Sequence, residues 1–191
     1  MRIVTAVLCC FVACLAGART ASAQTKPYIW ADIDCRQSRI VAWQGLKCRA
    51  TNIVTGEGNI GAFRRWTAFG TGPQGYYVHM FVWEAQNTFS YLAADETTAD
   101  FVTWMFEYGK SITQLSPVAR HKEADYVTFT DGKQGRKCIG FRRMGGFQRG
   151  GYNSVTGGIL CAPSGTTVTD NDVALFIDNV RLQGTPGASR R

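Results

Sequence analysis

The chain has 191 residues, a formal net charge of +7 and an apolar content of 45%. This composition excludes a disordered tail, because the chain can bury enough apolar surface to offset the entropy lost on folding. Its length corresponds to one ordinary domain with a sizeable core.

Residues 1–23 have the three parts of a cleavable secretory signal peptide. Arg2 gives a positive start, Ile3 to Gly17 is an uncharged run of 15 residues, and Ala21-Ser22-Ala23 is an A-x-A cleavage site. A transmembrane anchor is the first alternative, but it needs about 20 apolar residues. A lipid anchor is the second, but Ala18 stands where the acylated cysteine would have to be. We expect an exported protein, periplasmic or extracellular, without a transmembrane span after processing.

Cleavage after Ala23 leaves a moderately basic chain with a net charge of +5 and four cysteines, at positions 35, 48, 138 and 161. In an oxidising compartment four cysteines indicate two disulfides, with three connectivities. We favour the sequence-local pairing, Cys35 with Cys48 and Cys138 with Cys161, in which each bond closes a short loop. A zinc site is the alternative, but the pairs lack the C-x2–4-C spacing of zinc ligands. We therefore expect no metal and no cofactor.

The first half of the mature chain is rich in β-type runs separated by turns. The expected strands are residues 28–32, 39–43, 46–54, 60–69 and 76–83. The run from Tyr76 to Trp83 is almost continuous in aromatic and β-branched residues, which predicts a strand in the centre of a sheet. Residues 97–108 then form the first expected helix, with Val102 and Met105 on its apolar face.

The last third predicts a hairpin and a second helix. Strands are expected at 125–130 and 136–142, followed by an exposed glycine-rich loop from Gly145 to Gly151 and a strand at 155–162. Thr169 and Asp172 are spaced as a helix cap before an expected helix over 170–182. The sum is a single α+β domain over residues 24–183, mostly antiparallel sheet with two packed helices, followed by a flexible basic tail over 184–191.

A resemblance accompanies this last third. Lys137-Cys138-Ile139-Gly140-Phe141, the glycine-rich loop, the run from Gly158 to Gly165 and the closing helix are similar to the ends of small exported bacterial proteins of uncharacterised function. The resemblance covers about residues 125–182. It implies that Cys138 and Cys161 bridge neighbouring strands, and it gives no information about activity.

No catalytic motif stands out. The chain lacks a G-x-S-x-G elbow, a Walker loop and an H-E-x-x-H helix. His79 shares one face of its expected strand with Tyr77, Phe81 and Trp83. It is either a histidine packed among aromatic rings or the general base of a small exported hydrolase or transferase with an aromatic cleft.

A basic cluster is the strongest candidate site. It is carried by the hairpin and the glycine-rich loop and consists of Lys133, Arg136, Lys137, Arg142, Arg143 and Arg149, with Phe147 and Tyr152 beside them. Arginine side chains bind phosphate or carboxylate, and an accessible aromatic ring can stack on a sugar or a ring. The cluster predicts an anionic partner: a lipid headgroup, an acidic glycan or another envelope component. The alternative is a set of solubilising charges that protects an edge hairpin from strand pairing.

These patterns favour a non-enzymatic exported binding or envelope-associated domain. A sugar-binding module with exposed tryptophans is a further alternative, as is the enzyme around His79. Nucleic acid is not an expected partner, because an exported domain rarely meets it.

The signal peptide leads to a direct prediction. Export of the full chain should release a protein that begins at Gln24, because signal peptidase cleaves after the small residues of an A-x-A site. N-terminal sequencing or intact mass of the exported protein checks this. A protein that keeps Met1 or carries a lipid would contradict it.

Overall fold

The computed structural model describes residues 27–55, 61–88, 90–93, 95–106, 112–148 and 151–184. The expected signal peptide, residues 185–191 of the expected tail, and Arg149 lie outside the described residues. No helix within the described ranges is long and apolar enough to cross a membrane.

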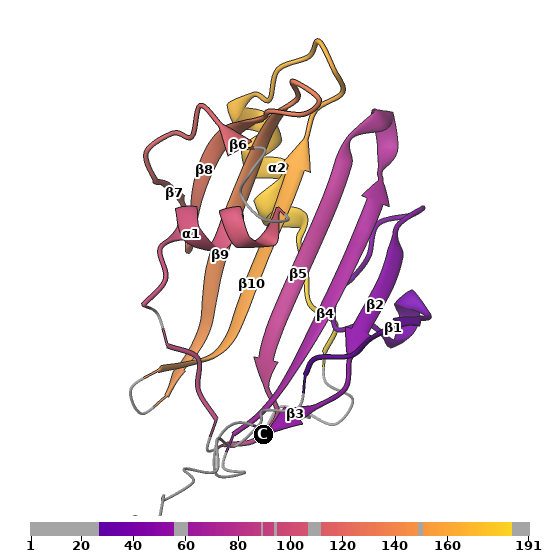
Figure 1. Cartoon of the computed structure of the whole chain (residues 1–191), viewed down its shortest axis with the longest axis vertical. Helices are drawn as coiled ribbons and strands as arrows, with labels where there is room; N and C mark the ends of the chain where they lie inside the picture. The colour runs from indigo at the N-terminus through magenta and orange to yellow at the C-terminus, as the bar shows by residue number, and fades with distance from the viewer. Residues whose placement is uncertain are drawn as a thin grey trace, which may run out of the picture.

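The described residues form one antiparallel sheet with the strand order β1-β2-β4-β5-β10-β9-β8-β6, with β3 beside β4 and β7 beside β8 (Figure 1). The strands are β1 (Trp30–Ile33), β2 (Lys47–Thr51), β3 (Val54–Thr55), β4 (Ala62–Thr71), β5 (Tyr77–Ala85), β6 (Ile112–Thr113), β7 (Ala119–His121), β8 (Ala124–Asp131), β9 (Lys137–Gln148) and β10 (Gly151–Cys161). The strand β5 lies between β4 and β10, which confirms the central position expected for the aromatic run.

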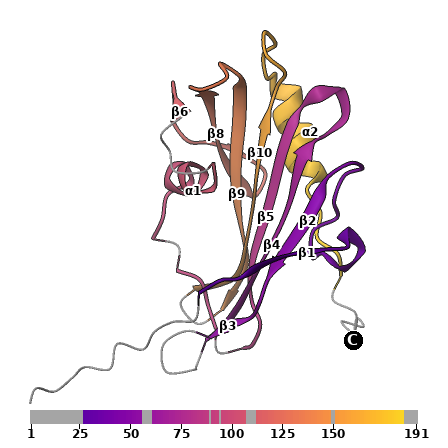
Figure 2. The same ribbon diagram turned by 45° about the vertical axis from the view of Figure 1, so that its right-hand side comes forward.

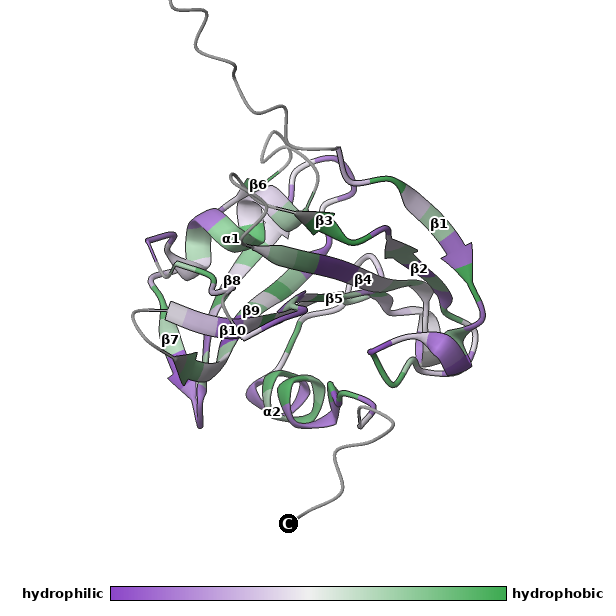
Figure 3. Ribbon diagram, turned by 90° about the horizontal axis from the view of Figure 1, so that it is seen from below, coloured by the Kyte–Doolittle hydropathy of each residue, from purple (hydrophilic) through white to green (hydrophobic). Residues whose placement is uncertain are grey.

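Two helices, α1 (Thr98–Met105) and α2 (Asp170–Asn179), lie on opposite faces of this sheet (Figures 2 and 3). Each begins with a complete capping box, Thr97 with Asp100 and Thr169 with Asp172, which satisfies two backbone N–H groups at the helix start. The mostly antiparallel α+β fold with two helices is therefore confirmed. Two short 3-10 helices, η1 (Cys35–Gln37) and η3 (Pro73–Gly75), complete the described elements.

The second helix is shorter than the predicted range of 170–182. It ends at Asn179, and Val180 already has an extended backbone. The expected strand over 39–43 is also wrong. Ile40 makes an isolated bridge with Leu182, and the Val41 N–H donates to the carbonyl of Arg181, so this segment pairs with the end of the chain rather than joining the sheet.

The predicted glycine-rich loop is also wrong, because β9 continues to Gln148 and β10 begins at Gly151. Gly145 pairs with Ser154, and a Cβ at Gly145 would lie 2.4 Å from the Ser154 hydroxyl oxygen. Gly145, Phe147, Gln148 and Gly151 are thus paired strand residues of a long hairpin rather than parts of an exposed loop.

Both disulfides have the predicted pairing. Cys35–Cys48 joins η1 to β2. Cys138–Cys161 joins β9 to β10 at directly opposite positions, with a Cα–Cα distance of 4.0 Å. Each half of the sheet therefore contains one disulfide.

Glycines let both helices approach the sheet. A Cβ on Gly157 would lie 2.3 Å from the Phe101 ring of α1, and a Cβ on the next residue, Gly158, would lie 2.7 Å from the Phe176 ring of α2. On β9, a Cβ on Gly140 would lie 2.5 Å from Val102 of α1. These three positions fix how closely the helices pack.

We predict that Gly157→Ala destabilises the fold by about 1–3 kcal/mol, because the added methyl overpacks a buried contact with Phe101. Urea denaturation measures the loss. Gly184→Ala is the matched control, since a Cβ there meets nothing within 4 Å. Equal unfolding free energies for the two variants would contradict this account of helix packing.

Candidate functional site

The candidate site is a groove on the sheet face that carries α1. This helix packs on β8, β9 and β10, and its Phe101 and Trp104 rings also contact Phe81 of β5. Two adjoining hollows of about 290 and 320 Å³ lie there. Tyr77, His79 and Met105 line both hollows, so the two hollows are neighbours on this face, and we refer to them together as the groove.

We name the two hollows by their chemistry. The cationic hollow is also lined by Phe106, Asp131, Lys133, Gln134 and Arg136. The aromatic hollow is also lined by Trp30, Arg49, Thr67, Phe69, Phe81 and Trp104.

Strand alternation explains why these side chains share one face. Tyr77, His79 and Phe81 are every second residue of β5 and therefore point the same way. Across the sheet, Phe69 of β4 is directly opposite His79, and Thr67 is directly opposite Phe81. The groove is thus assembled from neighbouring strands in register.

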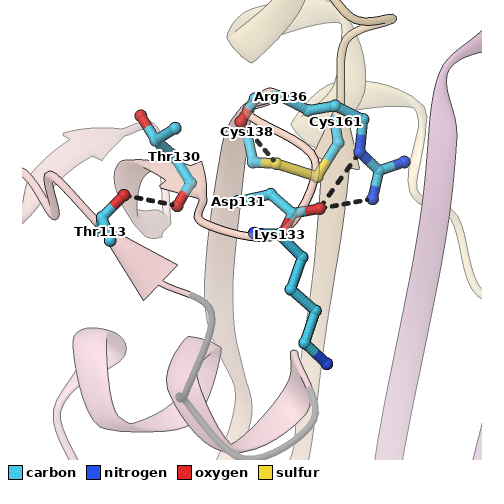
Figure 4. Close-up of polar contacts among 7 residues, drawn as sticks. All are labelled: Thr113, Thr130, Asp131, Lys133, Arg136, Cys138 and Cys161. Carbon is cyan, nitrogen blue, oxygen red and sulfur yellow. Dashed lines mark hydrogen bonds and ion pairs between the residues drawn. A yellow bond between two sulfur atoms is a disulfide. The ribbon is translucent and has the colours of Figure 1, made fainter.

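A buried ion pair forms one wall of the cationic hollow (Figure 4). The Arg136 guanidinium donates to one carboxylate oxygen of Asp131 at 2.9 and 3.3 Å, and Asp131 is only 2% exposed. The other Asp131 oxygen accepts the Lys133 backbone N–H at 3.0 Å. Arg136 also lies 5.1 Å from the centre of the Tyr77 ring. The charge of Asp131 is therefore neutralised within the protein.

Lys133 is different, because none of the ion pairs among the described residues involves its ammonium group. Its side chain is exposed and points away from the Asp131–Arg136 pair, as Figure 4 shows. Within the part of the chain that the structure describes, Lys133 thus adds an unpaired positive charge to the lining of the cationic hollow.

His79 is a packed, neutral histidine. Its Nε2 lies 2.6 Å from the Thr67 hydroxyl, which itself donates to the Met80 carbonyl at 3.0 Å. A hydrogen bond between Nε2 and this hydroxyl forms with either neutral tautomer of the ring, because the hydroxyl can donate or accept. Burial lowers the pKa of His79 to about 4, so the ring is uncharged at neutral pH.

The aromatic hollow combines exposed rings with a cation. Trp104 is 47% exposed, and its ring centre lies 5.3 Å from that of Phe81 in an edge-to-face contact. Arg49 reaches Asp32 at 3.0 Å, but this aspartate is 90% exposed. Outside the hollow, Arg65 lies over Tyr28, Trp83 and Trp104, and burial lowers the pKa of this guanidinium. Arg65 therefore helps to hold the Trp104 ring in place.

The structure does not bring the predicted basic cluster together on one surface. Lys133 and Arg136 line the groove. Arg142 faces α1 and donates to the backbone carbonyl of Glu96, whereas Arg143, the next residue of β9, donates to the Val180 carbonyl at 3.0 Å beyond the C-terminal end of α2. Lys137 bonds to Gln114 and Thr130. Because side chains alternate along β9, Arg142 and Arg143 lie on opposite faces of the sheet.

The remaining predicted residues lie at the far end of the hairpin. Phe147 is 69% exposed and contacts the Tyr152 ring edge-on at 5.3 Å. Arg149 lies outside the described residues. Phe147 and Tyr152 are separated from Lys133 and Arg136 by the length of β9. Trp30, Arg49 and Trp104 were missed because only tertiary structure brings these distant segments together.

Within the described residues, no three His, Cys, Asp or Glu side chains are grouped so that they could hold a metal ion. Comparisons of the chain with protein-family models, curated proteins and solved structures give no match.

The neutral state of His79 leads to a pH prediction. In the unfolded chain its pKa returns to about 6.5, so the unfolded state takes up a proton first as the pH falls. The stability that depends on neutral His79 is complete above about pH 6.5 and is lost as the pH falls toward 4. Between pH 7 and pH 4, the unfolding free energy of the wild type should fall by about 3 kcal/mol more than that of His79→Gln.

Urea denaturation at several pH values checks this difference. The carboxylates of the two proteins titrate alike, so their contribution cancels in the comparison. Parallel stability curves for wild type and His79→Gln would show that His79 is not held neutral in the fold.

Proposed function

We propose that this protein is an exported binding domain whose groove takes a ligand with negative charge. The groove carries the proposal. It consists of two adjoining hollows of about 290 and 320 Å³ with aromatic side chains and Lys133 in their lining. The Trp104 ring in this lining is 47% exposed, so a ligand can reach it.

Export is supported by two independent features. Residues 1–23 have the pattern of a cleavable signal. The two disulfides are bonds that persist in oxidising compartments and are rare in the reducing cytosol. We therefore place the working protein in the periplasm or outside the cell.

The charge of the groove supports an anionic ligand. Asp131 is matched by Arg136, and His79 is neutral, so Lys133 sets the net charge of the cationic hollow. A carboxylate or phosphate can accept charge-assisted hydrogen bonds from Lys133 and from the outer edge of the Arg136 guanidinium. Such bonds contribute about 1.5–3 kcal/mol each.

Binding is a better description of this groove than catalysis. A nucleophile needs a free base beside it and a group that orients the base. The Thr67 hydroxyl next to His79 also bonds to the Met80 carbonyl, and Thr67 is a buried residue of the sheet. The groove offers recognition surfaces without an activated nucleophile.

We predict that Lys133→Gln weakens binding of an anionic ligand roughly tenfold, because one charge-assisted contact is lost. The probes are polygalacturonate and phosphatidylglycerol vesicles, with neutral dextran as a blank, at 20 and 500 mM NaCl. High salt should weaken the same binding, since the contacts are solvent-exposed.

Arg181→Gln is the matched control, because it removes one positive charge from an exposed residue that does not line the groove. It should bind like the wild type. An equal loss in both variants, or no binding of any anionic probe, would contradict the proposed site.

A further inference from the structure

The aromatic hollow joins flat ring surfaces to polar groups. Trp104, which is 47% exposed, offers ring surface, while Arg49 and His79 place polar atoms in the same wall. An acyl chain would cover these polar atoms without bonding to them, and each buried unpaired group costs free energy. The wall therefore suits a ligand that has apolar faces and hydrogen-bonding edges together.

A sugar ring has this combination. Its C–H groups form an apolar face, and its hydroxyl groups lie around the edge. The negative face of an aromatic ring attracts such C–H groups. Trp104 is half exposed, and its ring is held by Phe81 and Arg65, so it offers a rigid platform that loses little entropy on binding.

The groove carries cations in both hollows. Lys133 and Arg136 line one hollow, and Arg49 lines the other. The ion pair of Arg49 is weak, because its partner Asp32 is 90% exposed to water. A ligand carboxylate can therefore compete for Arg49. Negative charge on more than one ring would match this spacing.

Resting on the proposed function, we infer that the ligand is an acidic oligosaccharide that spans both hollows. One sugar ring stacks on Trp104, and carboxylates of the chain meet Arg49 at one end and Lys133 with Arg136 at the other. The wall shared by Tyr77, His79 and Met105 lies under the linkage between them.

Isothermal titration calorimetry on the protein purified after expression of the full chain tests this. The probes are a galacturonic acid tetrasaccharide, the neutral galactose tetrasaccharide and the galacturonic acid monosaccharide. We expect the acidic tetrasaccharide to bind at least tenfold more tightly than either of the others. The neutral chain lacks the charge, and the monosaccharide cannot reach both hollows.

Trp104→Ala should weaken binding of the acidic tetrasaccharide roughly tenfold, and Trp104→Phe should restore part of it. Phe147→Ala is the matched control, since this aromatic residue is 69% exposed but does not line the groove. In the unmodified protein, the same tetrasaccharide should shift the indole N–H NMR signals of Trp30 and Trp104. That measurement holds even if Trp104→Ala fails to fold.

The outcomes separate the two proposals. The oligosaccharide inference is overturned if the neutral tetrasaccharide binds as tightly as the acidic one. It is also overturned if Trp104→Ala binds the acidic tetrasaccharide like the wild type and the indole signal of Trp104 in the unmodified protein does not shift. If inorganic phosphate or phosphatidylglycerol vesicles bind in a Lys133-dependent way and the acidic tetrasaccharide does not bind, the inference fails and the anion-binding proposal stands. If no anionic probe binds, both fail.

Discussion

The close approach of two helices to the middle of one sheet is the contact on which the rest of this structure depends. Gly157 and Gly158 are neighbours on β10 and face opposite sides, so one receives Phe101 of α1 and the other receives Phe176 of α2. Side chains at either position would push a helix outward. Gly140 extends the seat of α1 onto β9. Because the glycines lie under α1, the helix is confined to the β8–β10 half of the sheet.

This confinement creates the groove. Gly140 and Gly157 lie where α1 comes closest to the sheet, whereas β4 and β5 carry Phe69 and His79 on the same face beyond it. Trp104 of α1 adds a ring that is 47% exposed. A ligand that stacks on Trp104 would cover this exposed apolar surface.

Much of the fold could be predicted from local pattern. Capping residues and helical spacing located both helices, and the aromatic run of β5 indicated a central strand. Glycine was misread, because Gly145 and Gly151 resemble a loop in sequence but permit close strand pairing in the fold. Once β9 is extended, Arg142 and Arg143 must point to opposite faces, whereas the nearness of Trp30 and Trp104 depends on tertiary packing that no local pattern contains.

The electrostatics of the groove follow from which charges are already paired. Burial beside Thr67 keeps His79 uncharged, so the histidine cannot attract an anion in the neutral range. Asp131 is almost fully buried, and removing its partner would leave an isolated charge, so Arg136 is held in place by the fold as well as facing the ligand. The freedom to respond to a ligand therefore lies with Lys133, which is exposed and unpaired among the described residues. The Arg136 guanidinium and the Lys133 ammonium both line the cationic hollow, and the aromatic side chains of the adjoining hollow are where the remainder of the ligand would lie.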